Sequence, residues 1–203
     1  MYRQIRIGPI KTSKIEIQQL FTAWVAVSAA FAIAMTPWGL LFTSKIIYAF
    51  ILAAISVGTG FIFHEMGHKI LAQKYGCFAE FRAFNQMLIL AILLSFTGFI
   101  FAAPGAVMIS GRIDRKKNGM ISLMGPAINF ALVPIFLFVF AISSGFLKDI
   151  SKFGMLINCW IGIFNLIPFG NFDGIKIFKW NKIIYTITAV FGIALLIATQ
   201  MIK

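Results

Sequence analysis

The two histidines of the chain and one glutamate form a cluster that could do chemistry. They lie in the pentapeptide His64-Glu65-Met66-Gly67-His68. Residues four apart share one face of a helix, so both imidazoles can bind one metal ion, while Glu65 can reach a water on that ion without being a ligand. The cluster ends an apolar stretch, where each ionisable group is costly and usually functional. The spacing therefore predicts a metal site with His64 and His68 as ligands.

A catalytic zinc ion takes three protein ligands and leaves its fourth position to water. The sequence has few acidic residues to supply the third ligand. Glu80 and Asp114 lie in basic loops, and Glu16 lies at the expected membrane edge. Asp149 falls on the far side of the membrane. Asp173 remains as the predicted third ligand of Zn²⁺.

Asp173 directly follows an apolar run that ends at Phe172. Three residues that break or bend helices surround it: Pro168, Gly170 and Gly174. The carboxylate could therefore swing back toward the histidines. The alternative is a solvated carboxylate paired with Lys176 or Lys179, an interaction of small energetic value.

The elements that must position these residues are membrane helices. Of 203 residues, 60% are hydrophobic and only 12% are charged, and the net charge is +12. Soluble domains carry about 25% charged residues, which argues against a soluble enzyme. The basic residues are scattered between apolar runs, which is typical of cytoplasmic loops near anionic lipid and not of a nucleic-acid-binding surface.

Uncharged segments divide the chain into six runs. These are 17–44, 46–63, 83–111, 118–147, 153–172 and 183–202. A membrane-spanning helix needs about 20 residues, so the simplest expectation is six spans. The run 83–111 contains Gly98, Pro104 and Gly105, and a segment with these residues could instead enter the membrane and return on the same side.

The positive-inside rule distinguishes these two topologies. With an N-terminus in the cytoplasm and six spans, 10 basic residues lie inside and 8 outside; with a re-entrant 83–111, the tally becomes 14 against 4. Full crossing would also place Asp173 about 30 Å from the histidines. Both arguments favour an all-α membrane protein with about five transmembrane helices and a re-entrant segment, possibly with short strands, between the second and third.

The order of three motifs resembles the site-2 protease family of intramembrane zinc metalloproteases. HEMGH is followed by Gly125-Pro126-Ala127-Ile128-Asn129 and then by Asn165-Leu166-Ile167-Pro168 with a downstream Asp173-Gly174. The resemblance covers roughly residues 46 to 180, and an ordered set of motifs is more specific than HExxH alone.

This resemblance implies zinc ligands at His64, His68 and Asp173 and a catalytic base at Glu65. It further implies that Asn165 lies near the bound substrate. A supporting role in packing is implied for three residues of the middle motif: Gly125, Pro126 and Asn129. For Asn165, simple helix packing is nearly as plausible an explanation.

The expected function is that of a zinc endopeptidase, a hydrolase that cuts peptide bonds in or near transmembrane segments of other proteins. We expect a cytoplasmic segment at 1–16, then a single polytopic domain over 17–203 in the cell membrane, with the active site near the cytoplasmic face. The expected partners are a transmembrane protein substrate and the lipid bilayer, with no nucleic acid; the sequence does not indicate an oligomeric state.

The alternatives are a metal transporter that uses the same His/His/Asp site, and a proteolytically silent relative that only binds membrane segments. A transporter needs ionisable groups along a path through the bilayer, and the sequence supplies none beyond this cluster.

Overall fold

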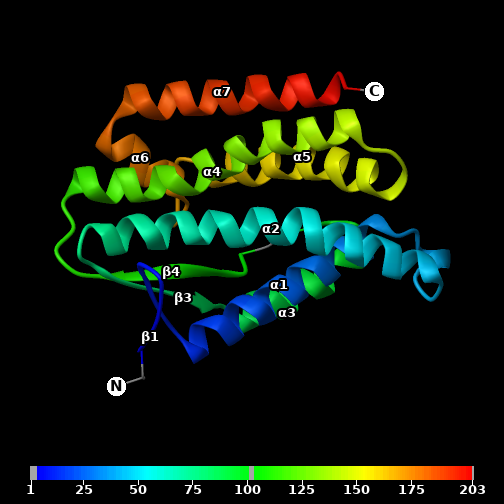
Figure 1. Ribbon diagram of the computed structural model, residues 1–203, viewed down its shortest axis with the longest axis horizontal. Helices are drawn as coiled ribbons and strands as arrows, with labels where there is room; N and C mark the ends of the chain where they lie inside the picture. The colour runs from blue at the N-terminus through cyan, green and yellow to red at the C-terminus, as the bar shows by residue number, and fades with distance from the viewer. Residues whose placement is uncertain (1–3, 101–102, 203) are drawn as a thin grey trace.

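The computed structural model describes residues 4–100 and 103–202, and the described chain is dominated by helices (Figure 1). Four helices are long and apolar enough to cross a membrane: α1 (Lys14–Met35), α2 (Ser44–Lys74), α4 (Arg115–Ile142) and α7 (Lys182–Gln200). The other helices are α3 (Asn85–Ser95), α5 (Gly145–Asn165) and α6 (Asp173–Trp180), with a short 3₁₀ turn at Trp38–Leu40. The predicted class, an all-α membrane protein, is confirmed.

Helices α1 and α2 form an antiparallel pair. The chain turns between them over 36–43, inside the first predicted run, and α2 then continues through the HEMGH motif to Lys74. The two helices approach closely at Gly58, where an added Cβ would lie 1.8 Å from Nε1 of Trp24. That indole N–H donates to the carbonyl of Ala54 at 2.9 Å, which fixes the contact across the pair.

The run 83–111 returns to its starting point, as the charge tally predicts. Strands β3 (Phe78–Ala83) and β4 (Gly105–Ser110) pair antiparallel, with Ala83 opposite Gly105 and Phe78 opposite Ser110. Helix α3 lies between them and has only 11 residues, and residues 101 and 102 of the run lie outside the described chain. Figure 1 shows that α4 begins at the end of the molecule where α2 ends.

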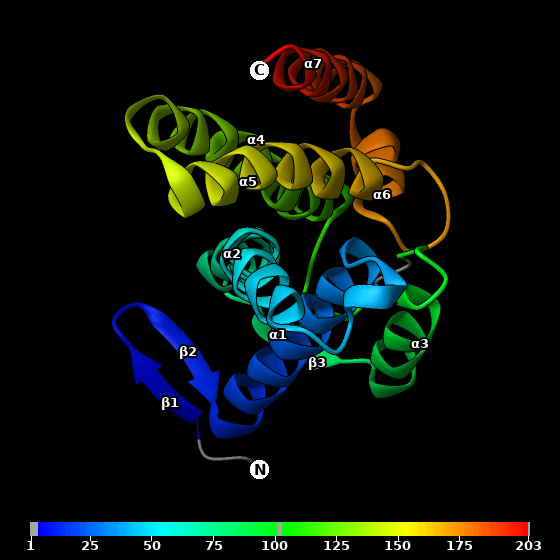
Figure 2. The same cartoon turned by 90° about the vertical axis from the view of Figure 1, so that its right-hand side faces the viewer.

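The second half of the chain packs as a helical layer of α4, α5, α6 and α7 (Figure 2). The span predicted at 153–172 corresponds to α5, which has different bounds and is not among the four apolar spans. Three charged residues near its start account for this: Lys148, Asp149 and Lys152. Residues 166–172 are not helical, so Asp173 stands at the first position of the next helix, α6.

A small hairpin precedes α1. It consists of β1 (Gln4–Ile7) and β2 (Ile10–Ser13), and Ser13 caps α1 by accepting the backbone N–H of Glu16 at 3.2 Å. The hairpin occupies most of the predicted segment 1–16, of which residues 1–3 lie outside the described chain. It lies at the same end of the molecule as β3, β4 and α6 (Figure 1).

Candidate metal centre

The three predicted ligands meet between α2 and α6. Oδ2 of Asp173 lies 3.4 Å from Nε2 of His64 and 3.0 Å from Nε2 of His68, and all three residues are buried. Zinc binds imidazole and carboxylate at about 2.0–2.1 Å, so neighbouring ligand atoms in a tetrahedral site are about 3.3 Å apart. The donor types and their separations therefore fit a zinc ion, and the three sequence-predicted ligands do converge.

The break between α5 and α6 brings Asp173 to this position. An added Cβ on Gly174 would lie 2.1 Å from the carbonyl oxygen of Leu166, so only glycine allows the start of α6 to fold back on the end of α5. The alternative partner of Asp173 is present as well, because Nζ of Lys176 lies 3.5 Å from Oδ1. Burial alone would raise the pKa of Asp173, but positive charge and hydrogen bonds from protonated His68 and His64 hold it below its ordinary value. Once the imidazoles are neutral, a carboxylate in this position is available as a ligand.

Gly125 of α4 forms one wall of the cluster. A Cβ built on it would lie 2.5 Å from Nε2 of both His64 and His68, the two atoms that would bind the metal. No side chain fits there without displacing an imidazole. Glycine at this position therefore leaves the space beside the two Nε2 atoms free of side-chain atoms.

The other ring nitrogen of each histidine has a hydrogen-bond partner on α4. Nδ1 of His64 lies 2.6 Å from Oδ1 of Asn129, and Nδ1 of His68 lies 2.8 Å from the carbonyl oxygen of Ile121. An acceptor at Nδ1 requires the N–H there and leaves Nε2 free to bind metal. Pro126 in α4 has no backbone N–H and therefore leaves the carbonyl of Ser122, four residues earlier, without its helical donor.

Glu65 lies beside the ligands without joining them. Its side chain is only 8% exposed, and within the described chain Oε2 has no hydrogen-bond partner. The carboxylate also interacts with the backbone of Val107 in β4. Buried polar atoms are nearly always paired, so an unpaired carboxylate oxygen next to a metal site is a candidate acceptor for a water proton.

Comparison with known proteins agrees with this geometry. The chain is 43% identical over 145 residues to the protein named "Putative zinc metalloprotease MJ0611" of Methanocaldococcus jannaschii, a match that covers 70% of this chain and 76% of that protein. The chain belongs to this family of zinc metalloproteases. It is also 27% identical over 186 residues to "Zinc metalloprotease MJ0392" of the same organism, covering 88% of this chain but 45% of that protein. No family model and no solved structure matches it.

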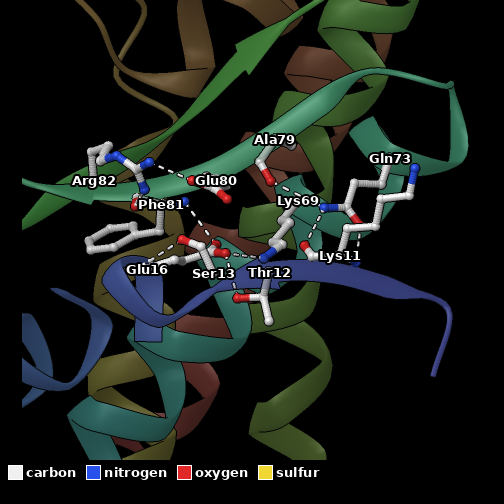
Figure 3. Close-up of polar contacts among 10 residues, drawn as sticks. All are labelled: Lys11, Thr12, Ser13, Glu16, Lys69, Gln73, Ala79, Glu80, Phe81 and Arg82. Atoms are coloured by element: carbon white, nitrogen blue, oxygen red, sulfur yellow. Dashed lines mark hydrogen bonds and ion pairs between the residues drawn. The ribbon is translucent and has the colours of Figure 1, made fainter. Parts of the chain in front are cut away.

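This member of the zinc metalloprotease family also has a buried ion pair next to the metal ligands (Figure 3). Lys69 follows His68 on α2, its side chain is 1% exposed, and its Nζ contacts Oε2 of Glu16 at the start of α1. Oε1 of Glu16 accepts the backbone N–H of Phe81 in β3 at 2.9 Å, and Oε2 also accepts the hydroxyl of Thr12. One carboxylate thereby joins α1, α2 and β3.

Two glutamines continue these contacts along the outer edge of β3. Oε1 of Gln19 accepts the N–H of Ala83 at 3.2 Å, and Nε2 of Gln73 donates to the carbonyl of Ala79 at 3.1 Å. Together with Glu16 on Phe81, side chains occupy every second residue of that edge. The outer edge of β4 instead faces α2, and the side chain of Glu65 interacts there with the backbone of Val107.

Asn165 lies at the last position of α5 and is half-buried. Its Nδ2 donates to the carbonyl of Ile161 in its own helix at 3.0 Å. The structure therefore does not place it among the hydrogen bonds of the metal cluster, and its role near a substrate stays a prediction.

Sequence reasoning missed three buried polar residues that this zinc metalloprotease fold uses: Glu16, Lys69 and Asn158. Glu16 appears in the sequence as a residue at the membrane edge, and its partner Lys69 lies 53 positions away. Oδ1 of Asn158 in α5 accepts a hydrogen bond from Nδ2 of Asn129 at 2.9 Å. An asparagine inside an apolar run was the one available signal for it.

Proposed function

We propose that this zinc metalloprotease is an intramembrane endopeptidase of the site-2 type. The observation that supports this most directly is the location of the ligand helix. His64, Glu65 and His68 all lie on α2, a 31-residue helix that contains an 18-residue window of mean hydropathy 2.3 and is long enough to cross a membrane. A site with this surrounding suits peptide bonds that lie within or near transmembrane segments.

Three residues, His64, His68 and Asp173, would hold the zinc ion. A zinc ion bound there supplies Lewis acidity, which polarises the scissile carbonyl and makes a water nucleophilic at neutral pH. Glu65 accepts the proton of the attacking water and passes it to the departing amide nitrogen. Asn165, with its amide at the end of α5, donates a hydrogen bond to the substrate backbone in this proposal.

The substrate is proposed to bind as an extended strand along β4. A transmembrane helix hides its carbonyls in internal hydrogen bonds, so the segment to be cut has to unwind locally. An exposed strand edge can then satisfy the freed backbone groups by strand addition. The outer edge of β4 is suited to this, because Val107 on that edge lies next to Glu65 while the outer edge of β3 is closed by side chains.

The protein is further proposed to lie in the cell membrane with its active site near the cytoplasmic face. Three basic segments lie at the end of the molecule that holds the metal cluster (Figure 1): 112–117, 176–182 and the hairpin with Arg6 and Lys11. Positive charge of this kind marks the cytoplasmic side and faces anionic lipid. Water would reach Glu65 from that side.

The decisive experiment is Glu65→Gln in protein reconstituted in liposomes with a single-span reporter peptide labelled at both ends. We expect the variant to bind about one zinc ion per chain, as the wild type does, and to lose cleavage by at least about 100-fold, the lower range for a general base. Asp114→Asn is the matched control, because Asp114 is a surface N-cap of α4 and asparagine caps equally well. A Glu65→Gln variant that still cuts the reporter would overturn the mechanism.

The same liposomes distinguish the transporter alternative. A transporter would move zinc across the bilayer at a rate that Glu65→Gln leaves unchanged, and would leave the reporter intact. The proposed protease shows no zinc flux above that of empty vesicles. Zinc flux without cleavage would favour the transporter, and neither flux nor cleavage despite bound zinc would favour a silent relative.

A further inference from the structure

We propose that Asn158 of α5 is a positioning residue that fixes the tautomer of His64. This inference rests on the zinc site of the proposed function. Within the described chain Asn158 makes no hydrogen bond to a metal ligand, and it acts through Asn129, whose Oδ1 lies 2.6 Å from Nδ1 of His64. Both asparagine side chains are completely buried.

A backbone carbonyl fixes the donor and acceptor order of this hydrogen-bond chain. Nδ2 of Asn158 donates to the carbonyl oxygen of Gly154, one helical turn earlier, at 2.8 Å. A carbonyl can only accept, so the amide of Asn158 must present its NH₂ there and its Oδ1 on the opposite side. That Oδ1 faces Asn129 at 2.9 Å and can only accept as well.

The amide of Asn129 is oriented by two acceptors. Its Nδ2 donates both to Oδ1 of Asn158 and to the carbonyl oxygen of Gly60 in α2, at 3.1 Å. With both protons of the amide used in this way, its oxygen must face His64. Nδ1 of His64 is therefore the donor of the last hydrogen bond, which leaves Nε2 with its lone pair toward the metal position.

The two histidines are thus oriented by different means. His68 is fixed by one backbone carbonyl, that of Ile121, which has no alternative orientation. His64 depends on two side-chain amides that could each rotate by half a turn if their other partners were removed. Gly60 leaves room for the side chain of Asn158 beside α2, because an added Cβ on Gly60 would lie 2.7 Å from Oδ1 of Asn158. Removing Asn158 should therefore affect His64 and leave His68 unchanged.

The test is an isosteric pair of variants, Asn158→Thr and Asn158→Val. Threonine can donate its hydroxyl to the carbonyl four residues earlier and accept from Asn129, so it keeps the direction of the chain, whereas valine of the same shape does neither. Partners that orient metal ligands are worth about 10–100-fold in metal affinity. We expect zinc affinity, measured by chelator competition, to fall about 10-fold in Asn158→Val and to stay near the wild-type value in Asn158→Thr.

A second readout needs no metal and no catalysis. Nitrogen NMR of protein labelled in its two histidines should show His64 protonated at Nδ1 in the zinc-free wild type, and a larger share of the other tautomer in Asn158→Val, with His68 unchanged. Ser151→Ala is the matched control, since Ser151 is buried on the same helix but bonds only to the carbonyl of Leu147. Equal zinc affinities for the Val and Thr variants, or a neutral wild-type His64 that carries its single proton at Nε2, would overturn the proposal. Failure of the wild type to bind zinc would instead count against the proposed function.

Discussion

Helix α2 carries two buried polar clusters on adjacent faces, and they are built in opposite ways. The metal side consists of His64 and His68 with their partners on α4 and α6, and its hydrogen bonds come from neutral amides and carbonyls. The sheet side consists of Glu65 and Lys69 facing α1, β3 and β4, and it is held by a buried ion pair with Glu16. The comparison shows which kind of polar contact suits a metal ligand and which suits a structural joint.

Charge explains the difference. An imidazole ligand must stay neutral to bind a cation, and amide or carbonyl acceptors orient it without adding charge. Lys69, one residue from a ligand, carries a positive charge that would repel a metal cation if it were left unpaired. Glu16 neutralises that charge and uses its remaining lone pairs on Phe81 and Thr12, so the ion pair also fastens the sheet. Variants on the two sides should therefore have separable effects.

The largest effect is expected from Gly125→Ala on the metal side. The new methyl group would lie 2.5 Å from Nε2 of both histidines and would push at least one of them away from the metal position. We expect zinc affinity to fall by more than about 100-fold, beyond what loss of an orienting partner costs. Metal analysis of purified protein measures this, with Gly39→Ala as control because nothing lies within 4 Å of a Cβ there. Full zinc occupancy in Gly125→Ala would contradict the assigned geometry.

The next largest effect is expected from Glu16→Gln on the sheet side. It leaves the ammonium group of Lys69 buried and unpaired, which costs about 3–5 kcal/mol of unfolding free energy. Replacing both partners with apolar residues, as Glu16→Leu with Lys69→Met, should recover part of that loss, since it removes the uncompensated charge but leaves the N–H of Phe81 without its acceptor. Denaturant unfolding in detergent measures both variants. If the double variant is no more stable than Glu16→Gln, the unpaired charge of Lys69 is not the source of the lost stability.

A smaller effect is expected from Asn129→Leu, which removes the acceptor from His64. Zinc affinity should fall about 10–100-fold, as for other residues that orient metal ligands. The same zinc affinity should also be measured in the Glu16→Leu, Lys69→Met double variant of the sheet side, which we expect to bind zinc as the wild type does. If the sheet-side variant weakens zinc binding as much as Asn129→Leu, the two sides are not separable.

The smallest effect is expected from Gln19→Leu at the outer edge of β3. One backbone hydrogen bond to Ala83 is lost, which is worth about 0.5–1.5 kcal/mol. Hydrogen exchange should become faster at the Ala83 amide, while zinc affinity stays unchanged. Unaltered exchange at Ala83 would show that Gln19 does not cap the strand.

The metal ligands could be predicted because each left a signal in the sequence. His64 and His68 are the two histidines of the chain at helical spacing, and Asp173 was selected by elimination and by the re-entrant topology. The return of 83–111 followed from the distribution of basic residues, and β3 and β4 now show the reason, because they pair with each other. These features follow from short-range spacing or from charge counting.

The rest depended on contacts between residues far apart in the chain. Glu16 and Lys69 are 53 positions apart, and Asn129 and Asn158 are 29 apart, with no periodicity that would connect them. The bounds of α5 were misplaced because its first two turns contain charged residues, which the search for uncharged runs excluded. Tertiary packing brings these side-chain partners together, so the local spacing of residue types in the sequence does not predict them.

The closed outer edge of β3 has a consequence for the behaviour of many copies in one membrane. A two-stranded sheet with two open edges could join with the sheets of neighbouring molecules into a continuous ladder, which is how exposed strands start aggregation. With Glu16, Gln19 and Gln73 on β3, such a ladder can grow from one edge only and stops after a single pairing. At high density in the bilayer we expect this sheet not to link neighbouring copies into continuous β-ladders.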